Sequence, residues 1–399
     1  MTWGVSWVTA LALLPALAWL YLLLAHGRFW RDDQRLPQAG AALPAWPAVV
    51  ALVPARNEAA VVGEAVRSIL AQDYPGNLSL VLVDDGSTDG TAEIAWRAAA
   101  AAGQGSRLSV VAAAAREPGW VGKLWAQESG RRAWLARAAA PDYWWLTDAD
   151  IGHAPEMLGR LVVKAEEERR ALVSLMVLLW CRSFWERLLI PPFVFFFQKL
   201  YPFARVNDDR SRLAAAAGGC MLLRAATLAE AGGLARIKDA LIDDCALAAL
   251  VKPVARRQNR GIWLGLTRKS RSLRPYRGLG EIWLMVARSA YTQLRQSPFL
   301  LLGTLAGMAL LYLVPLVVLA SVAWHEDLAA ALLGLATWVL MAVAIGPTER
   351  LYDRSWLWGL TLPLAALLYS AMTFDSARRH WLGRGGTWKG RVAAGKLEP

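Results

Sequence analysis

Cysteine and histidine are scarce in this chain, and their scarcity excludes two kinds of stabilised domain. The three cysteines, Cys181, Cys220 and Cys245, show no Cys-x-x-Cys spacing and have no histidine near them in the sequence. Neither a disulfide framework nor a structural zinc site is therefore expected. We interpret the three cysteines as small buried residues.

The chain also lacks the polarity of an ordinary soluble protein. Hydrophobic residues make up 56% of its 399 residues, and the mean hydropathy is +0.31. The length allows two average domains, but this composition indicates that part of the chain lies in a bilayer. Long apolar runs lie near both ends, whereas residues 28–297 mix charged and apolar residues and are numerous enough for one α/β domain.

Positive charge is in excess, with a net charge of +12. The Arg and Lys residues gather beside the apolar runs and around residues 268–277 rather than in one extended stripe. Nucleic acid is therefore not an expected partner, and anionic lipid headgroups and sugar-nucleotide phosphates explain the charge better.

The first apolar run, residues 5–25, has about the ~20-residue length that a helix needs to cross a bilayer. No Lys or Arg precedes it and no convincing small-residue cleavage site follows it, so we predict a retained anchor rather than a removed signal peptide. Arg28, Arg31 and Arg35 follow at once. By the positive-inside rule, they place the N-terminus outside and the central domain in the cytosol.

Three further apolar runs are each long enough to span, namely residues 299–323, 328–345 and 356–372. The acidic loop 325–327 and the basic residues Arg350 and Arg354 agree with alternating sides. Three full spans would place the basic tail, residues 374–399, outside, which opposes the positive-inside rule. One of the three runs is therefore a candidate for a re-entrant or interfacial segment.

The central stretch alternates short strand-like runs with helical ones. Strands are predicted at 48–53, 78–83, 107–112 and 143–147, each followed by a helix, at 58–71, 90–102, 122–139 and 155–168. This order builds a parallel sheet with right-handed crossovers. Ligands of such sheets lie beyond the carboxyl ends of the strands, so functional residues are expected there.

Polar residues do follow three of these strands. The segments are Pro-Ala-Arg-Asn-Glu at 54–58, Asp-Asp-Gly-Ser-Thr-Asp-Gly-Thr at 84–91 and Asp-Ala-Asp at 148–150. None of them is a Gly-x-Gly-x-x-Gly or Walker A loop, which disfavours a Rossmann dehydrogenase and a P-loop NTPase. Carboxylates rather than glycine-rich loops dominate this predicted site.

Asp148 and Asp150 stand two apart at a strand end, and a period of two points both side chains to one face. There they are suited to hold a divalent cation, Mg²⁺ or Mn²⁺, that grips a diphosphate. An isolated Asp-x-Asp is more often a solvated turn with helix-capping carboxylates before Pro155. The convergence of three polar strand ends favours the metal here.

Several other polar residues have two readings each. Asp84 and Asp85 are suited to accept hydrogen bonds from a base or ribose, while Asp89 is expected to cap a helix. Lys123, near a predicted helix N-terminus, is suited to meet a phosphate, although a lone Lys is usually just solvated.

Two later segments are also ambiguous. Gly219, in a Gly-Gly-Cys-Met stretch, fits either close backbone approach to a ligand or a simple bulge. Asp243 and Asp244 enter an apolar helical run, where they are suited to cap the helix or to act as a general base. Spacing alone does not choose between these readings.

In this order, the motifs PARNE, VDDGSTDGT, GK, DAD, GGC and IDD-x-x-L resemble the family 2 glycosyltransferases with a GT-A fold, over about residues 48–295. The resemblance implies that 54–58, including Pro54, Arg56 and Glu58, and Asp84 and Asp85 contact the nucleoside. It further implies that Asp148 and Asp150 bind the metal and that Asp244 is the catalytic base. A nucleotide-diphosphate sugar, with UDP as the expected nucleotide, is the implied donor.

Within that family, the anchor, the later apolar segments, RSLRPYRG and GGTWKGR resemble the bacterial hopanoid-associated glycosyltransferases. This implies a polycyclic isoprenoid lipid as acceptor and a multi-pass protein of the bacterial cytoplasmic membrane. Where processive synthases carry Gln-x-x-Arg-Trp, this chain keeps only Arg288, so polymerisation is not expected.

The expected mechanism is a single in-line displacement that inverts the anomeric centre. Asp244 takes the acceptor's proton, while the metal and Lys123 stabilise the departing diphosphate. Gly219, Asp243, Arg274 and Arg288 are candidates for acceptor-side or phosphate contacts.

Two segments are candidates for lipid contact. The aromatic stretch 190–203 is a membrane-dipping lip or ordinary core, and 281–296 is predicted as an interfacial helix with Arg288, Tyr291 and Arg295 on one face. The predicted domains are an anchor at 1–27, a GT-A domain at 28–297 that includes the interfacial helix near 279–296, a transmembrane region at 298–373 and a basic tail at 374–399.

Other functions remain open. A transferase for ceramide, carotenoid, polyprenyl phosphate or cell-surface polysaccharide is the alternative enzyme, and an inactive membrane scaffold is the alternative outside enzymes. In an inactive scaffold, the carboxylates of the site motifs are expected to be replaced by other residues, but all of them are present in this chain. A transporter is weaker still, because no span carries a central charged residue.

Overall fold

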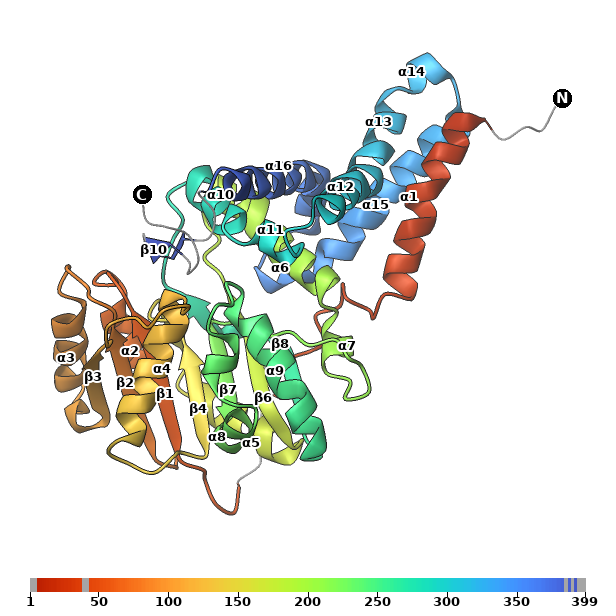
Figure 1. The fold of residues 1–399 in the computed structure, drawn as a ribbon. Helices are drawn as coiled ribbons and strands as arrows, with labels where there is room; N and C mark the ends of the chain where they lie inside the picture. Colours follow the sequence, from red (N-terminus) through yellow and green to blue (C-terminus); the bar gives the residue numbers. More distant parts are fainter. Residues whose placement is uncertain (1–5, 38–42, 384–386, 389–390, 393–399) are drawn as a thin grey trace. The chain divides into compact units, whose positions relative to one another are not determined.

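The computed structural model describes residues 6–37, 43–383, 387–388 and 391–392 (Figure 1). The chain divides into two compact units. The sheet unit comprises residues 34–180, 205–275 and the end from 386, and the helical unit comprises 1–33, 181–204 and 276–385. Segments 181–204 and 276–297, which the sequence grouped with the central domain, thus fall in the helical unit.

The sheet unit is built on one mixed sheet with the strand order β3-β2-β1-β4-β7-β6-β8-β5. Its strands are β1 (Val49–Ala55), β2 (Leu78–Asp84), β3 (Leu108–Ala112), β4 (Tyr143–Thr147), β5 (Ile151–His153), β6 (Arg170–Leu178), β7 (Cys220–Arg224) and β8 (Gly261–Ser272). Strands β3, β2, β1 and β4 are parallel neighbours, as are β6 and β8, whereas β7 and β5 run antiparallel to their neighbours. The mostly parallel sheet predicted from the sequence is confirmed.

Helices pack against this sheet in alternation with the strands (Figure 1). They are α2 (Val62–Leu70), α3 (Thr91–Ala101), α4 (Gly122–Leu135), α5 (Met157–Glu167), α8 (Ala225–Glu230) and α9 (Asp243–Arg257), with 3₁₀ turns at Gly105–Arg107 and Leu234–Ile237. The predicted helices 58–71 and 122–139 are shorter in the structure. The first begins only at Val62, which leaves Glu58 in a loop at the carboxyl end of β1.

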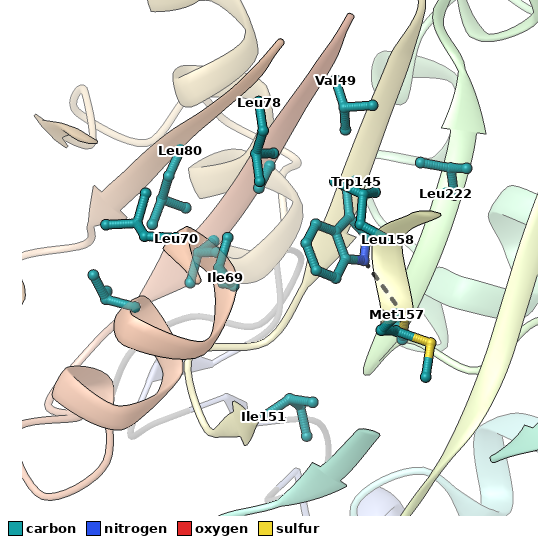
Figure 2. Close-up of a cluster of buried hydrophobic side chains, with 14 of the residues drawn as sticks. Val49, Ile69, Leu70, Leu78, Leu80, Trp145, Ile151, Met157, Leu158 and Leu222 are labelled. Atoms are coloured by element: carbon teal, nitrogen blue, oxygen red, sulfur yellow. Dashed lines mark hydrogen bonds between the residues drawn. The ribbon is translucent and has the colours of Figure 1, made fainter. Parts of the chain in front are cut away.

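One face of the sheet and the helices α2, α3 and α5 enclose the main hydrophobic core (Figure 2). Every second residue of β1 faces this core, in agreement with the two-residue period of a strand. The indole of Trp145 lies fully buried within it, and its Nε1 donates to the Cys220 Sγ at 3.5 Å. Cys220 is therefore buried as predicted, but Cys181 and Cys245 are only half-buried because they lie outside this core.

Gly130 lets helix α4 approach β1 and β2 closely. A Cβ at this position would lie 2.5 Å from the Cγ2 of Val83 and 3.5 Å from side-chain atoms of Leu52 and Val81. An added methyl therefore has no room unless the helix moves away from the sheet.

We expect Gly130→Ala to lower the free energy of unfolding by about 1–2 kcal/mol, because overpacking of about 1–3 kcal/mol exceeds the helix-propensity gain of alanine. Thermal unfolding in detergent measures it. Gly105→Ala is the matched control, since its Cβ would meet nothing within 4 Å. Equal midpoints for the two variants would contradict close packing at Gly130.

The helical unit contains the chain's apolar segments. Its elements are α1 (Trp7–Leu24), α6 (Phe184–Leu200), α10 (Leu279–Ala287), α11 (Ala290–Gln293), α12 (Pro298–Met308), a π-helical turn (Ala309–Leu313), α13 (Val314–Ala320), α14 (Val322–His325), α15 (Leu328–Leu351), a 3₁₀ turn (Trp356–Thr361) and α16 (Leu362–Trp381). Along the sequence, the helical unit gives way to the sheet unit within α7 (Phe203–Val206), and β9 (Thr387–Trp388) pairs with β10 (Arg391–Val392).

Among the described residues, four helical segments are long and apolar enough to cross a membrane: Trp7–Leu24, Pro298–Ala320, Leu328–Leu351 and Trp356–Trp381. They coincide with the four apolar runs of the sequence. The π-helical turn joins α12 and α13 into one such segment. All three C-terminal runs therefore have spanning length.

The aromatic stretch of α6 forms part of the core of the helical unit. Phe195 is fully buried and stacks on Trp19 of α1, with ring centroids 6.5 Å apart. Trp19 in turn meets Tyr312 edge-on and donates from Nε1 to the Leu311 carbonyl at 3.0 Å. Of the two readings of this stretch, ordinary core packing describes these side chains.

The predicted single interfacial helix at 281–296 is wrong. Helix α10 ends at Ala287, α11 spans only Ala290–Gln293, and Arg295 has a left-handed φ of 52° outside both. Tyr291 is buried rather than exposed, because its backbone N–H donates to the Ser376 Oγ and its ring packs against His380. Arg288, Tyr291 and Arg295 therefore do not form one helical face.

Candidate functional site

The carboxyl ends of β2, β1 and β4 bring the three polar segments of the sequence to one edge of the sheet. Val49 of β1 pairs with Leu78 of β2 on one side and with Tyr143 of β4 on the other, and all three strands run parallel. The segments at 54–58, 84–91 and 148–150 therefore emerge beside one another. Pro54 itself lies inside buried β1, opposite Val83.

Hydrogen bonds fix the first two segments to each other. The Asn57 N–H donates to the Ser87 Oγ at 3.0 Å, and the Thr88 N–H donates back to the Asn57 Oδ1 at 2.9 Å. Asn57 has a left-handed φ of 52°, which asparagine tolerates better than most residues. Asp89 accepts from the Thr91 N–H at the start of α3, although Gly90 rather than Asp89 holds the N-cap position of this helix.

Arg56, Asp84 and Asp85 lie in this pair of loops. Asp85 is almost fully buried, and its Oδ2 lies 3.6 Å from the Arg56 Nη1, which also donates to the Asp85 carbonyl. Asp84 accepts from the Ser87 N–H at 2.9 Å and so shapes the turn after β2. The loops present a guanidinium and carboxylates held in defined positions.

Lys123 lies at the centre of an acidic group. It is the second residue of α4, and its Nζ is 2.9 Å from the Asp148 Oδ1 and 3.3 Å from the Asp243 Oδ2. Burial acts to lower the pKa of Lys123, but the charges of Asp148, Asp243 and Asp244 outweigh burial and hold this pKa above its usual range. Lys123 is therefore a permanent cation among three carboxylates.

Asp244 is oriented by the backbone at the start of α9. Its Oδ2 accepts the Gly218 N–H at 2.9 Å, and its Oδ1 accepts the Cys245 N–H at 2.7 Å. Burial first, and the neighbouring Asp243 second, raise the pKa of Asp244, whereas Lys123 and these two N–H groups oppose the rise. A carboxylate in this environment is a better proton acceptor than an exposed one.

Gly218 allows these groups to come together. A Cβ on Gly218 would lie 3.2 Å from the Lys123 Nζ and 3.4 Å from the Asp244 Oδ2. The neighbouring Gly219 has a different contact: its carbonyl accepts the Thr147 Oγ1 hydroxyl at 2.8 Å, beside the end of β4. Of the two glycines, Gly218 makes the close approach to the acidic group.

Arg274 joins the first and third polar segments. Its guanidinium pairs with Glu58, and its Nε lies 3.2 Å from the Asp150 Oδ2. Glu58 and Asp150 thus share one cation, while Asp148 and Asp243 share another, Lys123. Arg288, the remaining candidate from the sequence, belongs to the helical unit, where its side chain is exposed at the end of α10.

Asp148 and Asp150 lie in a turn rather than on a strand. Strand β4 ends at Thr147, and the Ile151 N–H closes the turn by donating to the Asp148 carbonyl. The two-residue period used to predict a shared direction therefore does not apply, and the two carboxylates pair with different cations.

The donor set of this turn nevertheless fits a divalent cation. Both side chains keep part of their surface exposed, 34% for Asp148 and 25% for Asp150, and carboxylate oxygens are preferred by Mg²⁺ and Mn²⁺. No cluster of three or more His, Cys, Asp or Glu suited to a metal occurs in the described part of the chain. Two carboxylates with substrate phosphates and water are a common way to bind Mg²⁺.

A comparison with known families finds a match within this chain. Residues 50–232 match the model of the family described as glycosyl transferase family 2. This stretch of the chain is therefore similar to family 2 glycosyltransferases. The predicted enzyme class and GT-A fold are thereby confirmed, while the match ends before α9 and Asp244.

A solved structure also resembles this chain in fold. A mannosyltransferase from Pyrobaculum calidifontis, solved with GDP-mannose and Mn²⁺, is 22% identical with a TM-score of 0.56, over 94% of this chain and 99% of that one. Glucosyl-3-phosphoglycerate synthase from Mycobacterium tuberculosis is 19% identical with a TM-score of 0.38, over 63% of this chain and 80% of that one. No curated protein sequence matches the chain.

Sequence reasoning missed some contacts of the glycosyltransferase domain. Neither the Arg274 pairing with Glu58, 216 positions away, nor the Gly218 N–H bond to Asp244 follows from local spacing. The hydrogen bonds of Asn57 to Ser87 and Thr88 could have been expected from the sequence, because an asparagine at a strand end favours a tight left-handed turn.

Proposed function

We propose that this protein transfers a sugar from a nucleotide-diphosphate sugar to a lipid acceptor, with inversion at the anomeric carbon. One observation carries the proposal. Asp244, a carboxylate with a raised pKa, lies in the same group of side chains as Lys123 and the Asp-Ala-Asp turn. A proton acceptor, a cation for phosphate and a metal-suited turn thus share one site.

In this proposal the acceptor hydroxyl oxygen attacks the anomeric carbon and gives its proton to the Asp244 carboxylate. The new bond joins the acceptor oxygen to the anomeric carbon, and the bond from that carbon to the diphosphate oxygen breaks. Lys123 donates to the departing diphosphate. Arg56, Glu58, Asp84 and Asp85 line the nucleoside side, and buried Pro54 supports them from within β1.

Asp148 and Asp150 would hold Mg²⁺ or Mn²⁺, which supplies charge neutralisation for the diphosphate. The mannosyltransferase of similar fold was solved in complex with GDP-mannose and Mn²⁺. The expected nucleotide here is UDP, with GDP as the second candidate because of that neighbour.

The lipid acceptor is supported by the apolar segments on the same chain. Four of them have spanning length, and basic residues follow the first. We assign the sheet unit to the cytosolic side of a bacterial inner membrane, because Arg28, Arg31 and Arg35 follow α1. The resemblance to hopanoid-associated glycosyltransferases supports a polycyclic isoprenoid acceptor, with another lipid as the alternative.

The deciding experiment uses the full chain purified in detergent with Mn²⁺. Release of nucleoside diphosphate is measured for a panel of UDP- and GDP-sugars, with and without hopanoid or total-lipid extract, and the anomer of the product is determined by NMR. We expect lipid-stimulated release from one donor and an inverted product. Retention would overturn the role of Asp244, and no release from any donor by folded protein would favour the scaffold.

A further inference from the structure

Among the ion pairs of the candidate site described above, the pair of Arg274 with Glu58 joins the residues that lie farthest apart in the sequence. Arg274 pairs with Glu58 in the loop after β1 and with Asp150 in the turn after β4. The Glu58 side chain is only 8% exposed, so its charge depends strongly on a partner. Arg274 itself is 41% exposed, so its guanidinium is also within reach of solvent and of a soluble ligand.

The backbone places Arg274 at this point. Strand β5 pairs antiparallel with β8, with Ile151 opposite Ser272, and the Leu273 N–H extends the ladder by donating to the Asp150 carbonyl at 2.8 Å. The Arg274 N–H then donates to the Ser272 Oγ. The end of β8 is therefore fastened to the Asp-Ala-Asp turn, and the side chain of Arg274, two residues beyond the strand, reaches that turn.

This contact competes with the proposed metal. A divalent cation bound to the Asp150 carboxylate would stand beside the Arg274 guanidinium, and two positive charges on the same carboxylate repel each other. At Asp148, the other carboxylate proposed to bind the metal, the paired cation is Lys123. Of the two cations, Arg274 is the more exposed, at 41% against 17%, and is therefore the one with room to move.

We propose that Arg274 is a positioning residue that exchanges partners. It neutralises Asp150 until a metal binds there, and it then turns its guanidinium to the diphosphate of the donor while keeping contact with Glu58. A guanidinium is suited to both partners, because its planar donors match carboxylate and phosphate equally well. This inference rests on the proposed function, since it needs a metal and a nucleoside diphosphate.

If Arg274 exchanges partners, its removal should change the binding affinities for Mn²⁺ and for nucleoside diphosphate in opposite directions. Removing Arg274 removes a competitor for Asp150, so Mn²⁺ alone should bind Arg274→Gln about tenfold more tightly than it binds wild type. The same change removes a charged donor to phosphate, so nucleoside diphosphate with saturating Mn²⁺ should bind about tenfold more weakly. A merely structural ion pair would weaken both, because its loss disorders the turn.

The experiment measures Mn²⁺ binding by the electron paramagnetic resonance signal of free Mn²⁺, and UDP and GDP binding by calorimetry with and without Mn²⁺. Arg274→Lys keeps the charge, and we expect it to restore part of the diphosphate affinity. Arg271→Gln is the matched control, because Arg271 is nearby on β8, 67% exposed and 4.0 Å from Glu64, and both affinities should stay at the wild-type value.

Each outcome is decisive. Tighter Mn²⁺ with weaker diphosphate in Arg274→Gln supports the exchange. Weakening of both ligands, or no change in either, overturns it while wild-type binding leaves the proposed function standing. If wild type binds neither Mn²⁺ nor any nucleoside diphosphate although its thermal unfolding shows a folded protein, the proposed function itself fails.

Discussion

Asp244→Asn is expected to lower kcat by about a thousandfold while nucleotide binding stays close to the wild-type value. The asparagine cannot take the proton of the acceptor hydroxyl, so the attacking oxygen must lose it to water. Both Asp244 oxygens accept backbone N–H groups, from Gly218 and Cys245. The new NH₂ group therefore faces one N–H, and thermal unfolding must be followed alongside activity.

Asp243→Asn is the matched control for this prediction. Asp243 is the adjacent carboxylate and pairs with Lys123, but it makes no contact to the Gly218 N–H that orients Asp244. We expect a loss of about tenfold or less, because the base remains. The assignment of the base would be contradicted if the two variants lost kcat to a similar extent, or if Asp244→Asn kept as much as a tenth of the wild-type kcat.

The pH dependence gives the same residue a second test. The base works only when deprotonated, so kcat/KM should rise with pH through the pKa of Asp244. Burial and Asp243 raise that pKa above the ordinary carboxyl value. The acid limb of the profile is therefore expected above pH 4. In Asp243→Asn it should move to lower pH, because the repelling neighbour is gone.

The sequence was informative where a signal is local. Alternating apolar runs located β1, β2, β3 and β4 to within about two residues, and parallel crossovers then required their carboxyl ends to meet. The four spanning segments were equally plain, since length and hydropathy define them. The strand ends, and with them most candidate site residues, followed from these two rules.

The rest depended on contacts between distant residues. Strand β7 is antiparallel and lies between β4 and β6. The alternation of strand-like and helical runs in the sequence does not predict this position. Asp148 and Asp150 were placed at a strand end and given the two-residue period of a strand, because the turn after Thr147 has no glycine or proline to mark it. The break between α10 and α11 was missed for a similar reason: tertiary packing of Tyr291 overrides a continuous helical pattern.

Lys123→Met should have a comparably large effect, on both stability and activity. Three carboxylates surround this lysine, and without it Asp148, Asp243 and Asp244 lose their common counter-charge. Breaking a buried ion pair costs about 3–5 kcal/mol, and partial exposure of Asp148 reduces this to about 2 kcal/mol. Loss of a phosphate donor should lower kcat by about a hundredfold as well.

The stability loss in Lys123→Met should depend on pH in one direction. Lys123 opposes the rise in the Asp244 pKa, so its removal raises that pKa further above the unfolded value. The folded variant then binds more protons than the unfolded chain, and its stability falls as pH rises through this pKa. The difference from wild type should therefore be smallest in acid and reach its full size near neutral pH.

Lys269→Met is the control, because Lys269 is 56% exposed and pairs only at the surface with Glu156, at 3.1 Å. A surface pair of this kind contributes about 0–1 kcal/mol, without the same steep dependence on pH. Unfolding midpoints of the three proteins in detergent between acid and neutral pH measure the effect. If Lys123→Met lost no more stability than Lys269→Met at neutral pH, the three carboxylates would not need Lys123, and its central place in the proposed site would be wrong.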